Sequence, residues 1–108
     1  MRRRSMLILV LFAPLARAMD GARSISGVVT DKRGNLLPGA VVEIDNSISK
    51  EIRSYIVQKD GRYHFEDLNP DVEFVLHAQY HGHLSKNWTL SKFNGSRSVK
   101  ADFVIPID

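Results

Sequence analysis

The chain has 108 residues, no cysteine, 15 Lys and Arg and 12 Asp and Glu, for a formal net charge of +3. This length allows one small domain, and the lack of cysteine excludes a disulfide scaffold, so apolar packing and strand pairing must supply the stability. Four of the basic residues and none of the acidic ones lie in residues 1–18, so residues 19–108 carry 11 basic and 12 acidic side chains. That balance removes the charge argument for nucleic acid as a partner.

Residues 1–18 have the pattern of a secretory signal peptide. A basic start at Arg2, Arg3 and Arg4 precedes an almost wholly apolar stretch, and Ala16-Arg17-Ala18 places small residues at a cleavage point. The apolar stretch is shorter than the roughly 20 residues that span a bilayer. We therefore expect export to the periplasm or the extracellular space, no membrane span after cleavage, and a mature domain of residues 19–108. An uncleaved anchor is the alternative.

The first strand is predicted at residues 23–30, where Ile25 and Val29 share one face. Gly27 lies between them, and its missing side chain permits the close approach of another stretch of backbone. Residues 31–39 contain two Gly, one Pro and one Asn, each suited to a turn dihedral that most residues resist. The sequence therefore predicts a tight connection after the first strand.

The other strands are predicted from apolar residues that alternate with polar ones, the pattern of a strand with one buried face. They are expected at residues 40–45, 53–58, 63–65, 74–80, 83–90 and 98–105, the fifth being a short edge strand with a bend at Gly82 before it. For residues 53–58 the sequence leaves the inward face open. Turns are predicted at Asp60-Gly61, Asn69-Pro70 and Asn94-Gly95. The side chains expected to face the core are Ala40, Val42, Ile44, Tyr63, Phe65, Phe74, Leu76, Ala78, Tyr80, Val99, Ala101, Phe103 and Ile105.

Six or seven short strands without helical periodicity after residue 18 predict an all-β, two-sheet sandwich. Three spaced motifs along these strands are Gly27-Val28-Val29-Thr30-Asp31 followed by Leu37-Pro38-Gly39-Ala40, Asp60-Gly61-Arg62-Tyr63-His64-Phe65, and Asn69-Pro70-Asp71-Val72-Glu73-Phe74. Together they resemble the carboxypeptidase regulatory-like domain family, one of the transthyretin-like and carbohydrate-binding-like β-sandwiches. The resemblance implies an accessory or interaction domain of exported bacterial proteins, and it does not imply peptidase activity.

No catalytic arrangement is visible in the sequence. Ser and Thr residues are scattered and no Gly-x-Ser-x-Gly elbow occurs, so the geometry for acyl transfer has no support. The transthyretin-like fold that the resemblance implies also occurs in a hydrolase of a purine-degradation intermediate. That hydrolase uses a His in its first strand and ends in a Tyr-Arg-Gly-Ser motif. Val28 stands where that His is expected, and the motif is missing. We therefore expect no enzyme activity and no cofactor.

Two kinds of binding remain as hypotheses. The leading one is a structural or protein-interaction role in the cell envelope, in which a free strand edge recruits a partner chain. The alternative is a carbohydrate-binding module in which Trp88, the only Trp, forms an aromatic platform with Tyr80 and His81. Trp88 in a role that only caps the core is the simpler interpretation of that residue.

His77, His81 and His83 are the weak candidates for a metal site. Residues two apart on a strand share a face, and imidazole is a common zinc or copper ligand. Gly82 is expected to bend the chain between them, and neither a cysteine nor a fixed carboxylate accompanies them. We therefore expect three solvated surface histidines and no metal.

Overall fold

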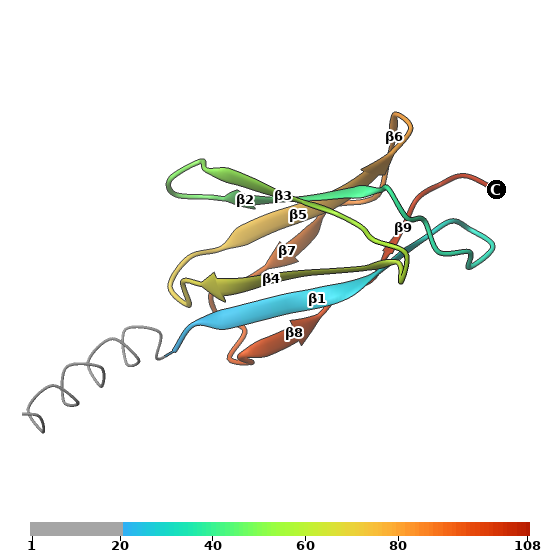
Figure 1. Cartoon of the computed structure of the whole chain (residues 1–108). Coiled ribbons are helices and arrows are strands. Elements are labelled where there is room, and N and C mark those ends of the chain that lie inside the picture. The colour runs from blue at the N-terminus through green and yellow to red at the C-terminus, as the bar shows by residue number, and fades with distance from the viewer. Residues whose placement is uncertain (1–20) are drawn as a thin grey trace, which may run out of the picture.

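The computed structural model describes residues 21–108 (Figure 1), so the expected signal peptide lies outside the described residues. This part of the chain forms nine strands and no helix. Accordingly, none of its segments is a long apolar helix of the kind that crosses a membrane. The strands are β1 (Arg23–Thr30), β2 (Val41–Asn46), β3 (Ile52–Ile56), β4 (Arg62–Leu68), β5 (Phe74–Tyr80), β6 (His83–Leu84), β7 (Trp88–Leu90), β8 (Ser98–Lys100) and β9 (Phe103–Val104).

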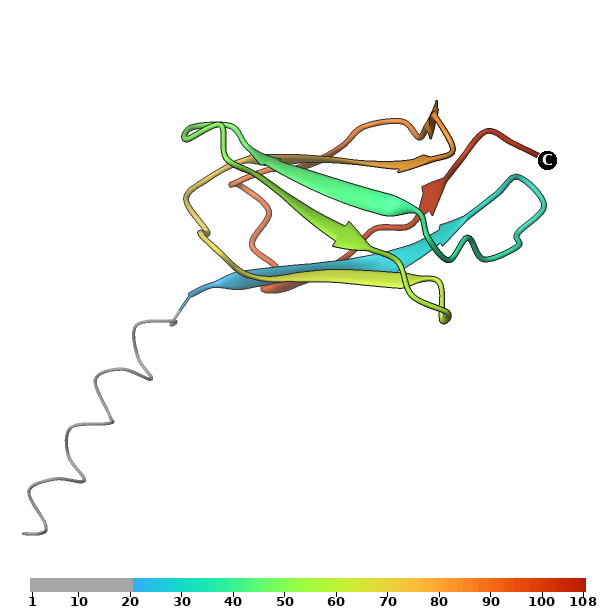
Figure 2. The same ribbon diagram turned by 45° about the horizontal axis from the view of Figure 1, so that its top comes forward.

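The strands form two sheets that pack face to face (Figure 2). One sheet has the order β4-β1-β8, with β9 also pairing with β1, and the other has the order β3-β2-β5-β6, with β7 also pairing with β5. The predicted all-β, two-sheet sandwich is therefore confirmed. The predicted number of six or seven strands is too low, because two of the expected strands are each interrupted.

The first interruption lies in the expected edge strand at residues 83–90, which divides into β6 and β7, both antiparallel to β5. Between them the Ser85 N–H donates to the Ala78 carbonyl at 2.8 Å, and the Ala78 N–H donates to Ser85 Oγ at 2.9 Å. A side-chain oxygen thus replaces a backbone carbonyl, and the register shifts by one residue, as in a β-bulge. Gly82, at a φ of +83°, makes the expected bend before β6.

The second interruption lies between β8 and β9, both of which run parallel to β1. Here the carbonyl oxygen of Ala101 passes over Gly27, and a Cβ added to that glycine would lie 1.9 Å from it. The same oxygen accepts a hydrogen bond of 2.6 Å from the Tyr63 hydroxyl. Because this carbonyl points away from the ladder, the Val28 N–H donates instead to Asp102 Oδ1, at 3.0 Å. The close backbone approach expected at Gly27 is confirmed.

Apolar side chains of both sheets fill the space between them, and the inward faces predicted from alternation are confirmed. Tyr80 is only partly buried, because it lies at the end of β5. β4 continues to Leu68, beyond the expected start of the loop, because Asp67 adopts a φ of +61° and Leu68 turns into the core. The buried apolar side chains are Ile25, Val29, Leu37, Ala40, Val42, Ile44, Val57, Tyr63, Phe65, Leu68, Val72, Phe74, Leu76, Ala78, Leu90, Val99, Ala101, Phe103 and Ile105.

The structure settles which face of β3 is turned inward. Tyr55 packs against the core, with its ring centroid 6.2 Å from that of Phe65, and Val57 just after the strand is buried. Ile52 and Ile56 lie on the opposite face and are 57% and 61% exposed. β3 is therefore an edge strand with an apolar outer face.

Arg23 is buried at the start of β1, although a charged residue at a strand end is expected to lie in solvent. Its guanidinium group donates to the carbonyl oxygens of Ser91 at 2.8 Å, Val72 at 2.9 Å and Asn94 at 3.3 Å. These carbonyls belong to two loops at the same end of the sandwich. Arg23 therefore ties both loops to β1 through backbone groups.

Asp31 organises the connection after β1. Its Oδ1 accepts the N–H groups of Arg33 and Asn35, each at 2.9 Å, and its Oδ2 accepts Nδ2 of Asn35 at 3.1 Å. Burial raises the pKa of the Asp31 carboxyl, but the hydrogen bonds from Asn35 and Arg33 and the charge of Arg33 together lower it below its ordinary value of 3.8. The ionised carboxylate therefore stabilises the folded turn.

Replacing Gly27 by Ala tests the contact with Ala101. No methyl group fits 1.9 Å from a backbone oxygen, so the C-terminal strands must move. We expect the Gly27→Ala variant to lose about 3 kcal/mol of unfolding free energy, measured by urea denaturation. Gly95→Ala is the control, because nothing lies within 4 Å of a Cβ added at Gly95. Equal stability of the two variants would contradict the close approach.

Acid unfolding tests the turn at Asp31. Because the folded pKa is lowered, the contribution of the carboxylate is complete above the ordinary pKa and is lost as the pH falls through the folded pKa. Asp31→Asn should therefore lower stability near neutral pH and flatten the decline of stability between about pH 5 and pH 2. Glu66→Gln, at an exposed position of β4, serves as the control and should keep the steeper decline. Parallel pH profiles for wild type and Asp31→Asn would rule out this role.

Candidate functional site

Trp88 lies on β7 in register with Leu76 of β5. Cross-strand partners share a face of the sheet, so the indole is on the same side as the buried Leu76. It is partly buried and packs against the hydrophobic core. Trp88 therefore closes one side of the core and keeps part of its ring accessible.

The accessible part of Trp88 lines a groove of about 650 Å³ on one side of the sandwich. One wall comes from the β6–β7 edge and the other from β9 and the segment after it; these are the orange and red segments of Figure 2. Leu84 and Val104, on opposite walls, are 56% and 54% exposed. The lining residues are Lys32, Leu84, Ser85, Lys86, Asn87, Trp88, Asp102, Phe103, Val104 and Pro106.

Both walls of the groove are strand edges without a further strand partner in the described part of the chain, since β9 pairs with β1 and β7 with β5. The Ile105 N–H donates to the Thr30 carbonyl at 2.8 Å. Alternate residues of a strand bond to the same neighbour, so the N–H and C=O of Val104 point away from β1. On the other wall the Ala78 N–H and C=O bond towards the β6–β7 edge, so by the same alternation Leu84, opposite Gln79, directs its backbone groups away from β5. The groove thus has free backbone donors and acceptors on both sides.

Two lysines and one carboxylate give the groove its charge. Lys32 and Lys86 line it, and neither forms an ion pair within residues 21–108. The Asp102 carboxylate also lines it, but its Oδ1 accepts the Val28 N–H. Burial, and after it the charge of Asp102, raise the pKa of Tyr63 above its ordinary value. The Tyr63 hydroxyl therefore stays protonated and keeps its hydrogen bond to Ala101.

Of the three residues expected to form an aromatic platform, two lie together. The rings of Tyr80 and His81 are stacked, with centroids 4.0 Å apart and planes 18° apart. Trp88 lies opposite Leu76, four residues before Tyr80 on β5, which is about 13 Å along the strand. The structure thus places a stacked pair at the β5–β6 turn and a separate indole in the groove.

The three histidines considered as metal ligands do not meet. His77 lies on the outer face of β5, and its Nε2 is 3.3 Å from Oε1 of Glu43. His81 occupies the turn at a φ of +48° and stacks on Tyr80, whereas His83 starts β6. Across residues 21–108 no group of three or more His, Asp or Glu side chains is arranged to hold a metal ion.

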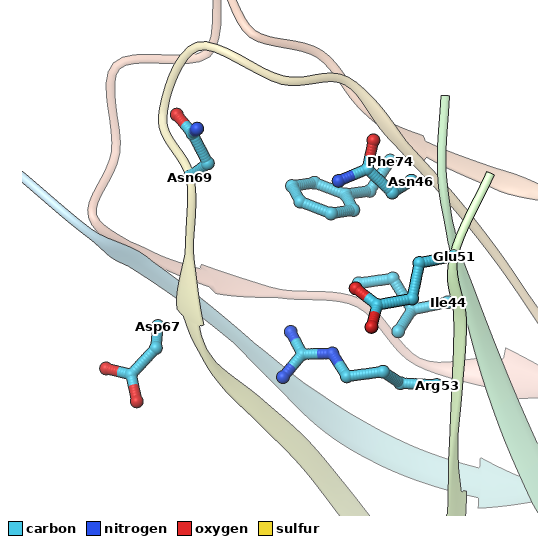
Figure 3. Close-up of a pocket in the computed structure, with 7 residues that line it drawn as sticks. All are labelled: Ile44, Asn46, Glu51, Arg53, Asp67, Asn69 and Phe74. Atoms are coloured by element: carbon cyan, nitrogen blue, oxygen red, sulfur yellow. The ribbon is translucent and has the colours of Figure 1, made fainter. Parts of the chain in front are cut away.

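A second hollow, of about 290 Å³, lies at the opposite side of the sandwich, between β3 and the end of β4 (Figure 3). The Arg53 guanidinium and the Glu51 carboxylate point into it, whereas the Asp67 carboxylate points away. Asn46 Oδ1 accepts two backbone N–H groups of the β2–β3 turn, and Asn69 Oδ1 accepts one. These amides brace turns, and no nucleophile with a neighbouring base lines the hollow.

The sequence identified Trp88 as a candidate binding residue. It did not predict the opposite wall of the groove, which Phe103, Val104 and Pro106 form. Whether two edges face each other depends on the order of strands in both sheets, which a single sequence does not state. A signal was nevertheless present, because Val104 is an apolar residue on the outward side of an alternating strand.

Solved structures with the same fold belong to functionally different proteins. S.CueP aligns with a TM-score of 0.56 at 12% identity, over 79% of this chain and 64% of that one. Catechol 1,2 dioxygenase of Acinetobacter radioresistens aligns with a TM-score of 0.58 at 11% identity, over 86% of this chain and 54% of that one. This chain therefore spans less than two thirds of either protein. Such low identities show the fold alone.

The C-terminal domain of the shaft pilin SpaA from Lactobacillus rhamnosus GG is similar over its whole length. It aligns with a TM-score of 0.52 at 12% identity, over 81% of this chain and 98% of that domain. No curated protein matches the sequence. The sequence model of the carboxypeptidase regulatory-like domain family matches residues 24–104. This range contains all the strands of the structure except Arg23, the first residue of β1. The chain therefore belongs to the carboxypeptidase regulatory-like domain family.

Proposed function

We propose that this domain is an exported, non-catalytic interaction module that binds an extended segment of a partner protein in the groove beside Trp88. The observation that carries the proposal is the pair of free strand edges, at Leu84 and Val104, that border one groove. An extended segment between them would pair with backbone groups on both sides, as in strand addition.

The groove suits such a segment in shape and charge. Leu84, Trp88, Phe103, Val104 and Pro106 supply apolar surface for alternate side chains of the ligand. Lys32 and Lys86 have no ion-pair partner within residues 21–108 and favour an acidic residue beside the apolar ones. The preferred ligand is therefore an extended peptide with alternating apolar residues and a neighbouring Asp or Glu.

Three further features support an exported contact role without catalysis. Residues 1–18 have the composition of a signal peptide. In neither hollow is a nucleophile hydrogen-bonded to a base, since the Ser85 hydroxyl in the groove bonds only to backbone groups of Ala78 and Lys86. The fold is shared with a domain of a shaft pilin, and a contact role in the cell envelope agrees with that likeness.

Carbohydrate binding is the second candidate, because the stacked rings of Tyr80 and His81 and the partly accessible Trp88 offer aromatic surface. The separation of about 13 Å along β5 between the pair and the indole weakens the idea of a single platform. A glycan ligand would depend on the Trp88 ring and would be indifferent to the backbone N–H of Val104.

Peptide selection against the purified protein separates the two candidates. We expect a displayed peptide library to yield extended apolar–acidic sequences, and their binding should shift the fluorescence of Trp88, the only Trp, to shorter wavelengths. Val104→Pro removes an N–H that β1 does not use, and should weaken binding at least about tenfold. Ser54→Pro, on the distant edge strand β3, is the matched control and should leave binding unchanged.

Two results would contradict the proposal. One is a set of selected peptides whose affinity is the same for Val104→Pro and wild type. The other is an absence of selected peptides together with binding on a glycan array that Trp88→Ala abolishes, which would favour the carbohydrate alternative.

A further inference from the structure

The edge strand β3 leaves a row of backbone groups unpaired on the side away from β2. The Asn46 N–H donates to the Glu51 carbonyl and the Val57 N–H to the Ala40 carbonyl, so odd-numbered residues of this segment bond to β2. Because bonding alternates along an antiparallel pair, Ile52, Ser54 and Ile56 direct their N–H and C=O groups outward. Four of the five β3 residues are exposed, which leaves this edge accessible.

The side chains along this edge are arranged symmetrically. β3 reads Ile-Arg-Ser-Tyr-Ile, and Ile52 and Ile56 flank Ser54 on the outer face, where they are 57% and 61% exposed. The strand contains no proline, and its register with β2 is continuous, so it lacks two devices that commonly protect an edge. One outward-facing carbonyl, that of Ile56, accepts a hydrogen bond of 3.0 Å from Nε2 of the nearby Gln58 side chain. A partner strand can displace this exposed amide.

We propose that two copies of this domain associate by antiparallel pairing of β3 with β3 about a twofold axis at Ser54. In this register Ser54 lies opposite Ser54 of the second copy, and each Ile52 lies opposite Ile56 of the other copy. All three outward-facing residues then form hydrogen-bonded pairs, and the isoleucines pack across the join. The two β3-containing sheets become one continuous sheet.

Charge selects this register over its neighbours. Pairing centred on Ser54 places the Arg53 guanidinium beside the Tyr55 ring of the second copy, a favourable cation–π arrangement. Centring on Arg53 would oppose two guanidinium groups, which is destabilising. Centring on Tyr55 would place Ile52 opposite the polar Gln58. Of these three registers, the one centred on Ser54 pairs isoleucine with isoleucine on both sides of the axis and opposes no like charges.

The interface is small, which sets its strength. Two five-residue strands bury less than the roughly 1,200 Å² of a stable protein interface, and pairing must displace the Gln58 amide from the Ile56 carbonyl. The association is therefore weak and concentration-dependent. It uses the edge of the sheet opposite the β6–β7 groove, so peptide binding and self-association are independent of each other.

Disulfide trapping tests the register directly, because the chain has no cysteine of its own. In a hydrogen-bonded antiparallel pair the Cα atoms lie about 5.5 Å apart, within the range that a disulfide spans. Ser54→Cys should therefore form covalent dimers on mild oxidation at least about tenfold faster than Ile56→Cys. In the control the two thiols would lie on opposite sides of the twofold axis, about 13 Å apart.

Analytical ultracentrifugation of the wild type and of variants without an introduced cysteine measures the self-association itself. We expect wild type to self-associate as its concentration rises towards the millimolar range, Ser54→Pro to stay monomeric, and Gln58→Ala to dimerise more strongly. Equal oxidation rates for Ser54→Cys and Ile56→Cys, or a monomeric wild type at millimolar concentration, would overturn the proposal. Val104→Pro should dimerise like wild type. The experiment therefore distinguishes a failure of the self-association proposal from a failure of the peptide-binding proposal.

Discussion

The approach of Ala101 to Gly27 is the contact on which the arrangement of the C-terminal strands depends. An oxygen that would lie 1.9 Å from a Cβ can occupy its position only above glycine. The Tyr63 hydroxyl holds that oxygen at 2.6 Å, and Asp102 takes the Val28 N–H that the displaced carbonyl leaves. β8 and β9 therefore run parallel to β1 on either side of this point. Because β9 is fixed there, its free edge faces the β6–β7 edge across the groove.

The two ends of the sandwich are held by polar groups in different ways. At one end Arg23 has no carboxylate partner within residues 21–108 and lies among the carbonyls of Val72, Ser91 and Asn94. Burying a cation costs several kcal/mol, and only hydrogen bonds with good geometry offset this. At the other end the ionised Asp31 holds its own turn. In a domain without disulfides, these backbone-directed bonds fix the loops that apolar packing does not reach.

Alternation of apolar residues was enough to predict the sandwich and the inward faces of its strands other than β3, and the glycine itself predicted the close approach at Gly27, because each depends on local sequence. The interruptions were not predictable, because the Ser85 hydroxyl and the Asp102 carboxylate replace backbone acceptors only once distant strands are in place. The burial of Arg23 likewise depends on loops 49 to 71 residues away. Trp88 was identified as a candidate from its type alone, whereas the opposite wall of its groove emerges from the order of the strands.

Binding in the groove depends on one property of the free domain: the backbone groups of Leu84 and Val104 must be unpaired. Amide hydrogen exchange measured residue by residue by NMR tests this most directly, since protection reports hydrogen bonding in the folded state. We expect fast exchange at Leu84 and Val104 and slow exchange at their neighbours Ser85 and Phe103, which bond to β5 and β1. Equal protection of all four amides would contradict the account, because the groove would then have no free strand edge to offer.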